Sequence, residues 1–203
     1  MIKITLPDGS VKEFASGVTP MEVAKSISEG FARNVISASF NGTTVETTTP
    51  LTTDGSLILY TWNDEDGKKA FWHSTSHVMA QVLEQMYPGI KLTLGPAIAN
   101  GFYYDVDFEE HKITEADFKK IEDRVLEISR GKHEFKLRPV SKADALELYK
   151  DNVYKTEMIT NLEDGTITFC DHDTFTDLCR GGHIPNAGII EAMKIMSVAG
   201  AYW

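Results

Sequence analysis

The first 62 residues alternate apolar and polar positions in short runs, a pattern typical of strands with one buried face. The run MIKITLPDGSVKEF (1–14) predicts two strands joined by an Asp-Gly turn. Residues 35–51 predict a strand, an Asn-Gly turn and a second short strand. The apolar run SLILYTW (56–62) predicts a buried strand that closes this unit.

A helix is expected between these strands, over TPMEVAKSIS (19–28). Thr19 is a good N-cap, Pro20 suits the first helical position, and Glu22 completes a capping box with Thr19. The apolar stripe of this helix consists of Val23, Ala24 and Ile27. Hairpin, helix and strands in this order predict a small β-grasp (ubiquitin-like) domain over residues 1–62.

The segment NDEDGKKA (63–70) is polar and turn-rich, and we expect it to link the first domain to a second domain, 63–203. A helix from Phe71 to Tyr87 should follow and end at the Pro-Gly pair. KLTLGPAIANGFYYDVDF (91–108) predicts two strands around a glycine-bearing turn.

The rest of the second domain mixes helices and strands. A helix capped by Thr114 should stop at Gly131, and a strand (135–140) should precede a short helix capped by Ser141. YKTEMIT (154–160), EDGT and ITFC (167–170) predict a further hairpin, and the tail from 177 on combines a glycine turn with apolar stretches. The second domain is therefore expected to be larger and α+β in class.

Composition places the chain among ordinary globular proteins, with 42% hydrophobic and 25% charged residues. No apolar run approaches the roughly 20 residues that span a bilayer, and the start MIKITLPDGS lacks the apolar core of a secretory signal. Two cysteines do not make a disulfide framework. We expect a reduced, cytoplasmic protein with no membrane partner.

Charge is unevenly distributed along the chain, whose formal net charge is −10. Residues 111–138 carry eight Lys/Arg and six Asp/Glu, so this segment has a net charge of +2. A polyanion should dock near this segment rather than elsewhere, although a solvated helix with mixed charges explains the same pattern.

The strongest chemical signal is a pair of histidine motifs. His73 and His77 are four residues apart in a predicted helix and therefore share a face. Cys179 and His183 are also four apart in CRGGH, where two glycines favour a tight turn over a helix.

Three interpretations of these motifs compete. The histidines and Cys179 could be packed as core residues, they could bind a tetrahedral zinc ion as a set of three histidines and one cysteine, or they could position water and transfer protons without a metal. A nucleophilic Cys-His pair is a weaker fourth interpretation. The spacing does not separate the zinc interpretation from the acid/base one.

Two charged residues lie near these motifs. Asp177 is two residues before Cys179, and Lys155 lies in VYKTEM, where an alternating strand would point it inward. The simpler alternative for both is a solvated surface charge.

Five sequence blocks together resemble a known family. HSTSH, LGPAIANGFYYDVD, YKTEM, DLCRGGHIPN and MSVAGAYW follow a β-grasp pattern in this order. The whole chain is similar to the N-terminal region of bacterial threonyl-tRNA synthetase, with a TGS domain over 1–62 and an editing (second additional) domain over 63–203. A single HxxxH motif is weak evidence, whereas the ordered set is specific.

The resemblance implies hydrolysis of the ester in mischarged seryl-tRNA(Thr), with the tRNA acceptor end and the remainder of the synthetase chain as partners. It implies a pocket that needs no metal or cofactor, unlike the zinc-holding domain of alanyl-tRNA synthetases. The residues that match the family's pocket are His73, His77, Tyr104, Lys155, Asp177, Cys179 and His183.

The chemistry of ester hydrolysis suggests a role for each of these residues. His73 would orient the attacking water as a base, Lys155 would stabilise the leaving ribose oxygen, and Asp177 would bind the substrate's α-amino group. Tyr104 would contact the substrate. The pocket's shape would come from His77, Cys179 and His183.

Two departures from the family pattern matter. Gly182 stands where the family often has proline, which leaves the placement of His183 open. The chain ends at AGAYW without an ATP-binding core, so we expect a fragment that does not activate threonine. The alternatives are a freestanding zinc-dependent deacylase of the alanyl-editing type and a non-catalytic, TGS-containing binding module.

Overall fold

The computed structural model describes residues 1–200. Their backbone divides into two compact units, the first made of Met1–Phe71 with Gly181–Pro185, and the second of Trp72–Arg180 with the residues from Asn186 on. The last three residues of the predicted tail, 201–203, lie outside the described part of the chain.

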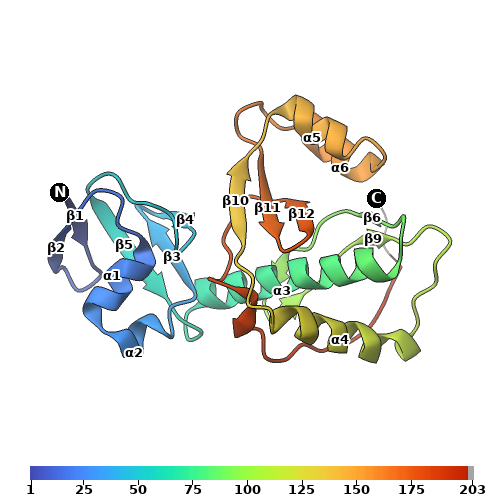
Figure 1. The fold of residues 1–203 in the computed structure, drawn as a ribbon, viewed down its shortest axis with the longest axis horizontal. Coiled ribbons are helices and arrows are strands. Elements are labelled where there is room, and N and C mark those ends of the chain that lie inside the picture. The colour runs from blue at the N-terminus through green and yellow to red at the C-terminus, as the bar shows by residue number, and fades with distance from the viewer. Residues whose placement is uncertain (201–203) are drawn as a thin grey trace. The chain divides into compact units, whose positions relative to one another are not determined.

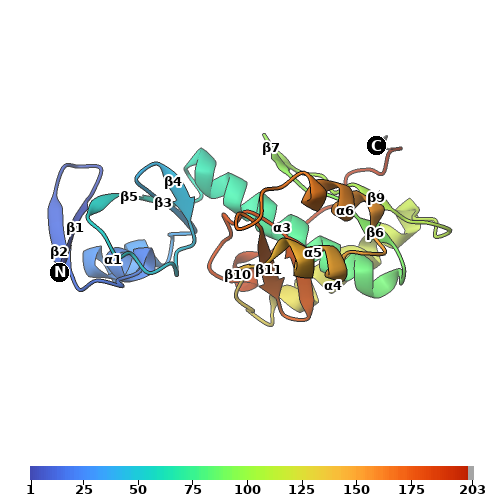
Figure 2. The ribbon, with the colours of Figure 1, turned by 90° about the horizontal axis from the view of Figure 1, so that it is seen from above.

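The first unit contains a five-stranded sheet in the order β2-β1-β5-β3-β4, in which β1 and β5 are parallel and the other neighbours are antiparallel. Helix α1 lies along one face of this sheet (Figures 1 and 2). The elements are β1 (Ile2–Thr5), β2 (Val11–Phe14), α1 (Pro20–Ile27), α2 (Glu29–Ala32), β3 (Ser37–Phe40), β4 (Thr43–Val45) and β5 (Gly55–Tyr60). The predicted β-grasp fold is confirmed.

Local sequence signals explain these elements. The hairpin predicted over residues 1–14 is present, and Gly9 has the positive φ of 82° that its turn requires. The predicted capping box of α1 is also present, because the Thr19 hydroxyl accepts the Glu22 N–H and the Glu22 carboxylate accepts the Thr19 N–H. Val23 then packs against Ile4 and Leu57 of the sheet.

Three details of the first unit differ from the expectation. Ile27 is 43% exposed and lies outside the buried stripe of α1. The closing strand stops at Tyr60 and alternates, with Leu57 fully buried and Ile58 40% exposed, because one face of β5 packs into the core while the other does not.

The long helix α3 (Glu65–Met86) begins earlier than predicted, so the expected linker is wrong from residue 65 on. The Asp64 carboxylate accepts the Thr61 N–H at 2.7 Å, and the Asp64 carbonyl accepts the Lys68 N–H. Gly67 is required here because a Cβ would lie 1.9 Å from the Thr61 carbonyl oxygen. The first turn of α3 contains the acidic residues Glu65 and Asp66, which suit a helix N-terminus. Their polarity is why this turn was predicted as a linker.

The second unit contains a three-stranded antiparallel sheet in the order β10-β11-β12 and two smaller two-stranded sheets. The strands are β6 (Lys91–Leu92), β7 (Ala97–Ile98), β8 (Gly101–Phe102), β9 (Val106–Asp107), β10 (Lys136–Pro139), β11 (Thr168–His172) and β12 (Phe175–Leu178). Residues 91–108 thus form four short strands, with β7–β8 nested inside β6–β9, rather than the two expected.

Besides α3, the second unit contains the helices α4 (Glu115–Ser129), α5 (Lys142–Leu148) and α6 (Val153–Thr160) and a 3₁₀ turn at Ala187–Ile189 (Figure 1). Helix α3 packs against the sheet through Ala80, which lies beside Phe175 of β12. The predicted caps Thr114 and Ser141 begin α4 and α5 as expected. Ala145 of α5 and Ile159 of α6 pack in one cluster with Phe169 of β11. The mixture of helices and strands confirms the α+β class.

The predicted hairpin at 154–160 is wrong, because these residues form α6. The Asn152 side chain caps this helix by accepting the Lys155 N–H at 3.1 Å. Strand β11 pairs instead with β10 and β12. In residues 1–200 no helix is both long and apolar enough to cross a membrane.

Candidate functional site

Helix α3 carries the first pair of candidate residues. His73 and His77 are one turn apart on the same face, with ring centroids 4.6 Å apart in an edge-to-face arrangement. His77 is buried, whereas His73 is only partly buried. Between them, the Ser76 hydroxyl lies 2.7 Å from the His73 carbonyl oxygen and 2.9 Å from the Gly95 carbonyl oxygen. The second contact joins α3 to the segment that precedes β7.

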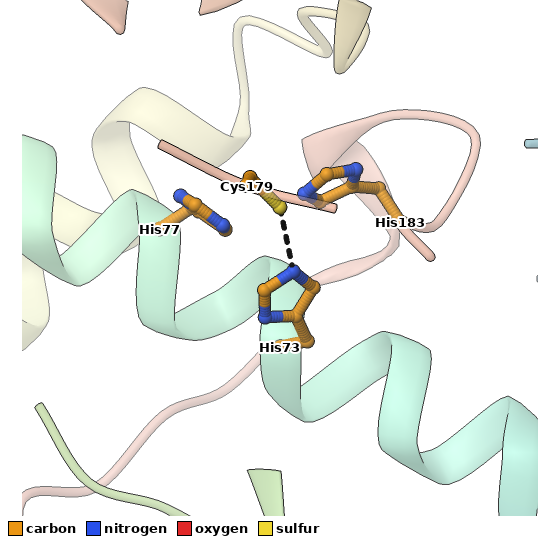
Figure 3. A group of neighbouring side chains, drawn as sticks. All are labelled: His73, His77, Cys179 and His183. Atoms are coloured by element: carbon orange, nitrogen blue, oxygen red, sulfur yellow. Dashed lines mark hydrogen bonds between the residues drawn. The ribbon is translucent and has the colours of Figure 1, made fainter. Parts of the chain in front are cut away.

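The second pair follows strand β12. The Cys179 N–H donates to the Thr168 carbonyl, so the sheet holds the start of the loop. Cys179 Sγ lies 3.1 Å from His73 Nε2. One potential ligand atom from each of His73, His77, Cys179 and His183 lies within 4.8 Å of the others, and Figure 3 shows these four side chains converging.

Asp177 is the centre of a buried polar network on the same strand. Its Oδ1 accepts the Lys155 ammonium at 2.6 Å and the Leu178 N–H at 2.8 Å, and its Oδ2 accepts the Tyr104 hydroxyl at 2.7 Å. His77 Nδ1 lies 3.3 Å from Oδ2. Asp177 therefore joins the predicted substrate-binding residues to the histidine pair of α3.

Burial and charge act against each other in this network. Burial alone would raise the pKa of Asp177, but Lys155 and then His77 more than offset it, so the pKa lies well below the usual range. Burial lowers the pKa of His77, yet its interactions with Cys179 and with the Asp177 carboxylate produce a net rise. Burial and then Asp177 raise the pKa of Tyr104, so its hydroxyl stays protonated as the donor.

All seven residues predicted from the sequence belong either to the histidine and cysteine group or to the network around Asp177. His77 and Asp177 connect the two groups. Lys155 is 2% exposed, but it points inward from α6 rather than from the alternating strand that was expected. The interpretation of Lys155 and Asp177 as surface charges is wrong, because both are buried and paired.

Two residues that hold the site were not predicted from the sequence. Asn152 caps the helix that carries Lys155, and its amide also donates to the Leu92 carbonyl at 2.8 Å. An N-cap signal could have identified it. Glu46 contacts the loop of His183 from a position 137 residues earlier in the chain, and no sequence pattern indicates this contact.

The donor set also fits a metal ion. Three imidazoles and one thiol are ligands that zinc prefers, and tetrahedral zinc at about 2.0–2.3 Å from its ligands places them about 3.3–3.8 Å apart. The four donors here lie within 4.8 Å of one another. If zinc were bound, it would polarise a water or ester carbonyl.

Comparisons with known proteins identify the domains and relatives of this chain. The TGS domain model matches residues 2–61, and the model of the threonyl and alanyl tRNA synthetase second additional domain matches residues 166–201. The chain is 86% identical over 203 residues to a threonine–tRNA ligase of Flavobacterium johnsoniae and 50% identical over 205 residues to that of Cytophaga hutchinsonii.

The chain spans about a third of the length of these relatives, 31% and 32% respectively. The similarity extends over all of this chain in both cases. The resemblance derived from the five sequence blocks is thereby confirmed. The chain belongs to the threonyl-tRNA synthetase family and corresponds to its N-terminal region, which contains the TGS domain and the second additional domain.

Proposed function

We propose that this protein hydrolyses the ester bond of seryl-tRNA(Thr), as the editing region of a threonine–tRNA ligase. The observation that carries the proposal is the grouping of three imidazoles and a thiol beside the buried Lys155–Asp177 pair. Imidazoles that accept and return a proton and a fixed cation that stabilises negative charge are groups suited to ester hydrolysis.

His73 is the proposed base. It is the one member of the four-residue group that is not fully buried, so it can meet both water and substrate. In the proposed step His73 takes a proton from water while the water oxygen attacks the ester carbonyl. The bond to the ribose oxygen then breaks, and the proton passes to that oxygen, which leaves free serine and the tRNA hydroxyl.

Lys155 is the proposed stabiliser of the negative charge that develops on the leaving ribose oxygen. Its ammonium is held at 2.6 Å by Asp177, so its position is set before the substrate arrives. Three hydrogen bonds already reach the Asp177 carboxylate, which favours an orienting role for this residue over the contact with the substrate's α-amino group.

Selectivity for serine is proposed to come from a second sieve. Serine lacks one methyl group of threonine, which is worth only about 1–3 kcal/mol in a binding pocket. A site lined by His77, Cys179 and His183 would admit serine and clash with the additional methyl of threonine. The acceptor end of tRNA is the proposed partner, with weak and salt-sensitive binding because the chain is acidic overall.

A deacylation assay tests the proposal. The purified chain should hydrolyse seryl-tRNA(Thr) faster than threonyl-tRNA(Thr), and His73→Ala should reduce the rate by about 100-fold or more. His111→Ala is the matched control, since His111 is an exposed histidine of the second unit. An unchanged rate for His73→Ala would contradict the role of His73 as the base. If the wild-type chain hydrolyses no seryl-tRNA(Thr), the proposed function is wrong.

A zinc-dependent deacylase is the second candidate, because the four donors fit a tetrahedral ion. In that case the protein would contain about one zinc per chain, and a chelator would abolish hydrolysis. Activity that survives the chelator in metal-free protein would favour the water-based mechanism.

A further inference from the structure

Glu46 is a buried carboxylate that the proposed reaction does not yet use. It follows strand β4 within residues 2–61, the part of the chain that the TGS model matches. Its exposed fraction is 9%, which is unusual for a glutamate. A carboxylate at this burial needs hydrogen-bond donors to offset the loss of water.

Three hydrogen bonds reach Glu46 from the CRGGH loop. The Gly182 N–H donates to Oε1 at 3.0 Å, and the His183 N–H donates to Oε2 at 3.1 Å. The ring of His183 adds a third bond, from Nδ1 to Oε1 at 2.9 Å. Glu46 and Gly181–Pro185 belong to the same compact unit.

These contacts fix the proton on the His183 ring. An ionised carboxylate only accepts hydrogen bonds, so Nδ1 must carry the hydrogen that it donates to Glu46. In the neutral ring, Nε2 is then the nitrogen that accepts a hydrogen bond or binds a metal. Glu46 thus sets both the tautomer and the orientation of His183.

The loop geometry depends on glycine at position 182. Gly182 has φ of +89°, which proline does not adopt, and proline would also lack the N–H that bonds to Glu46. A Cβ at this position would already touch the Thr44 methyl at 3.4 Å. The residue that departs from the resembled family's pattern is therefore one that lets the backbone donate to Glu46.

We propose that Glu46 is a positioning residue for the editing reaction, through which the TGS domain fixes the tautomer and orientation of His183. This inference rests on the proposed function of the histidine and cysteine group. It assigns Glu46, which lies within the residues that the TGS model matches, a part in orienting His183 of the same compact unit. Orientation of a histidine by a carboxylate serves a water-based and a metal-based site equally.

Glu46→Gln is the main test, because glutamine has the same shape but lacks the charge and one acceptor oxygen. We expect kcat for seryl-tRNA(Thr) deacylation to fall about 10–100-fold, as for other residues that orient a reactive histidine. KM should stay unchanged, since Glu46 acts through His183. Glu13→Gln, an exposed carboxylate of the same unit, is the matched control and should keep wild-type kcat.

Nitrogen-15 NMR of the His183 ring separates this inference from the proposed function. The wild-type chain should show the Nδ1-protonated tautomer, and Glu46→Gln should show a mixture of both tautomers. This signal is measurable even if the chain hydrolyses no ester. If Glu46→Gln does not fold, the tautomer of His183 in the wild type still tests the proposal. An Nε2-protonated His183 in the wild type, or unchanged kcat in folded Glu46→Gln, would overturn the proposal.

Discussion

The sheet of the first unit and the polar network around Asp177 are both buried, but they are held together differently. In the sheet, Ile4, Leu57 and Val23 are fully buried and packed without directional bonds. In the network, Asp177 and Lys155 are equally inaccessible and depend on hydrogen bonds of 2.6–2.8 Å. Apolar packing loses stability gradually as volume is removed, whereas a buried charge network fails when a single partner is lost.

The largest effect should come from breaking the ion pair. Asp177→Ala leaves the Lys155 ammonium buried without its carboxylate, and we expect the free energy of unfolding to fall by about 3–5 kcal/mol. Urea denaturation measures the change. The double variant Asp177→Asn with Lys155→Met, which removes both charges, should recover most of the loss.

The exposed pair of Arg138 and Asp171 is the matched control. It joins neighbouring strands of the same unit, but both side chains are about a third or more exposed. Asp171→Ala should therefore cost no more than about 1 kcal/mol. Equal losses for Asp171→Ala and Asp177→Ala would show that burial does not distinguish the two pairs.

The next effect concerns the apolar region. Leu57→Ala should cost about 2–5 kcal/mol, because the fully buried side chain leaves a cavity between the sheet and α1. Ile58→Ala, at the next position of β5, should cost no more than about 1 kcal/mol because the side chain is 40% exposed. Similar losses at both positions would mean that the strand is buried on both faces, as its sequence had indicated.

The same contrast explains which parts of the fold could be predicted from sequence. Asp-Gly and Asn-Gly turns, the Thr19 capping box and alternating apolar residues are local signals, and the β-grasp unit follows from them. The second unit has strands of two residues and a helix at 153–160 that reads as a strand. The β-branched and alternating residues of this helix favoured a strand in the sequence-based prediction, and the helix signal from the Asn152 cap was overlooked.

Acidification should weaken the polar network selectively. Lys155 and His77 outweigh the effect of burial and lower the pKa of Asp177 below its value in the unfolded chain, so the unfolded state binds more protons in acid. The resulting stabilisation is complete above about pH 4, the ordinary pKa of aspartate. It is lost as the pH falls below that value.

Urea denaturation between neutral pH and about pH 3 measures this loss. The difference in unfolding free energy between the wild type and Asp177→Asn should shrink as the pH falls. Asp151→Asn, at an exposed position, should differ little from the wild type throughout. A constant difference between the wild type and Asp177→Asn would contradict a lowered pKa of Asp177.

The candidate site was predictable in its residues but not in its architecture. The HxxxH and CxxxH spacings and the sequence blocks identified the residues that converge in Figure 3. The contacts that orient them could not be inferred, because the Glu46–His183 and Tyr104–Asp177 hydrogen bonds join residues 137 and 73 positions apart. Such pairs become visible only when the fold brings distant segments together.

The smallest effect compares two helix caps. Thr19→Ala and Asn152→Ala should each cost about 1 kcal/mol of stability, since each removes the side chain that accepts a first-turn N–H. Their effects on deacylation should differ. Asn152 caps the helix turn that carries Lys155 and bonds to the Leu92 carbonyl, so its loss should displace the ammonium and lower kcat several-fold.

The stability and kcat of both cap variants, measured together, decide whether Asn152 positions Lys155. Asn152→Asp keeps the capping oxygen and loses the donor to Leu92, so it should retain stability better than kcat. If Asn152→Ala and Thr19→Ala lose equal stability and neither changes kcat, the cap of α6 acts only on folding. In that case the position of Lys155 is set by its bond to Asp177 alone, and the polar network is less dependent on the surrounding helix than these contacts indicate.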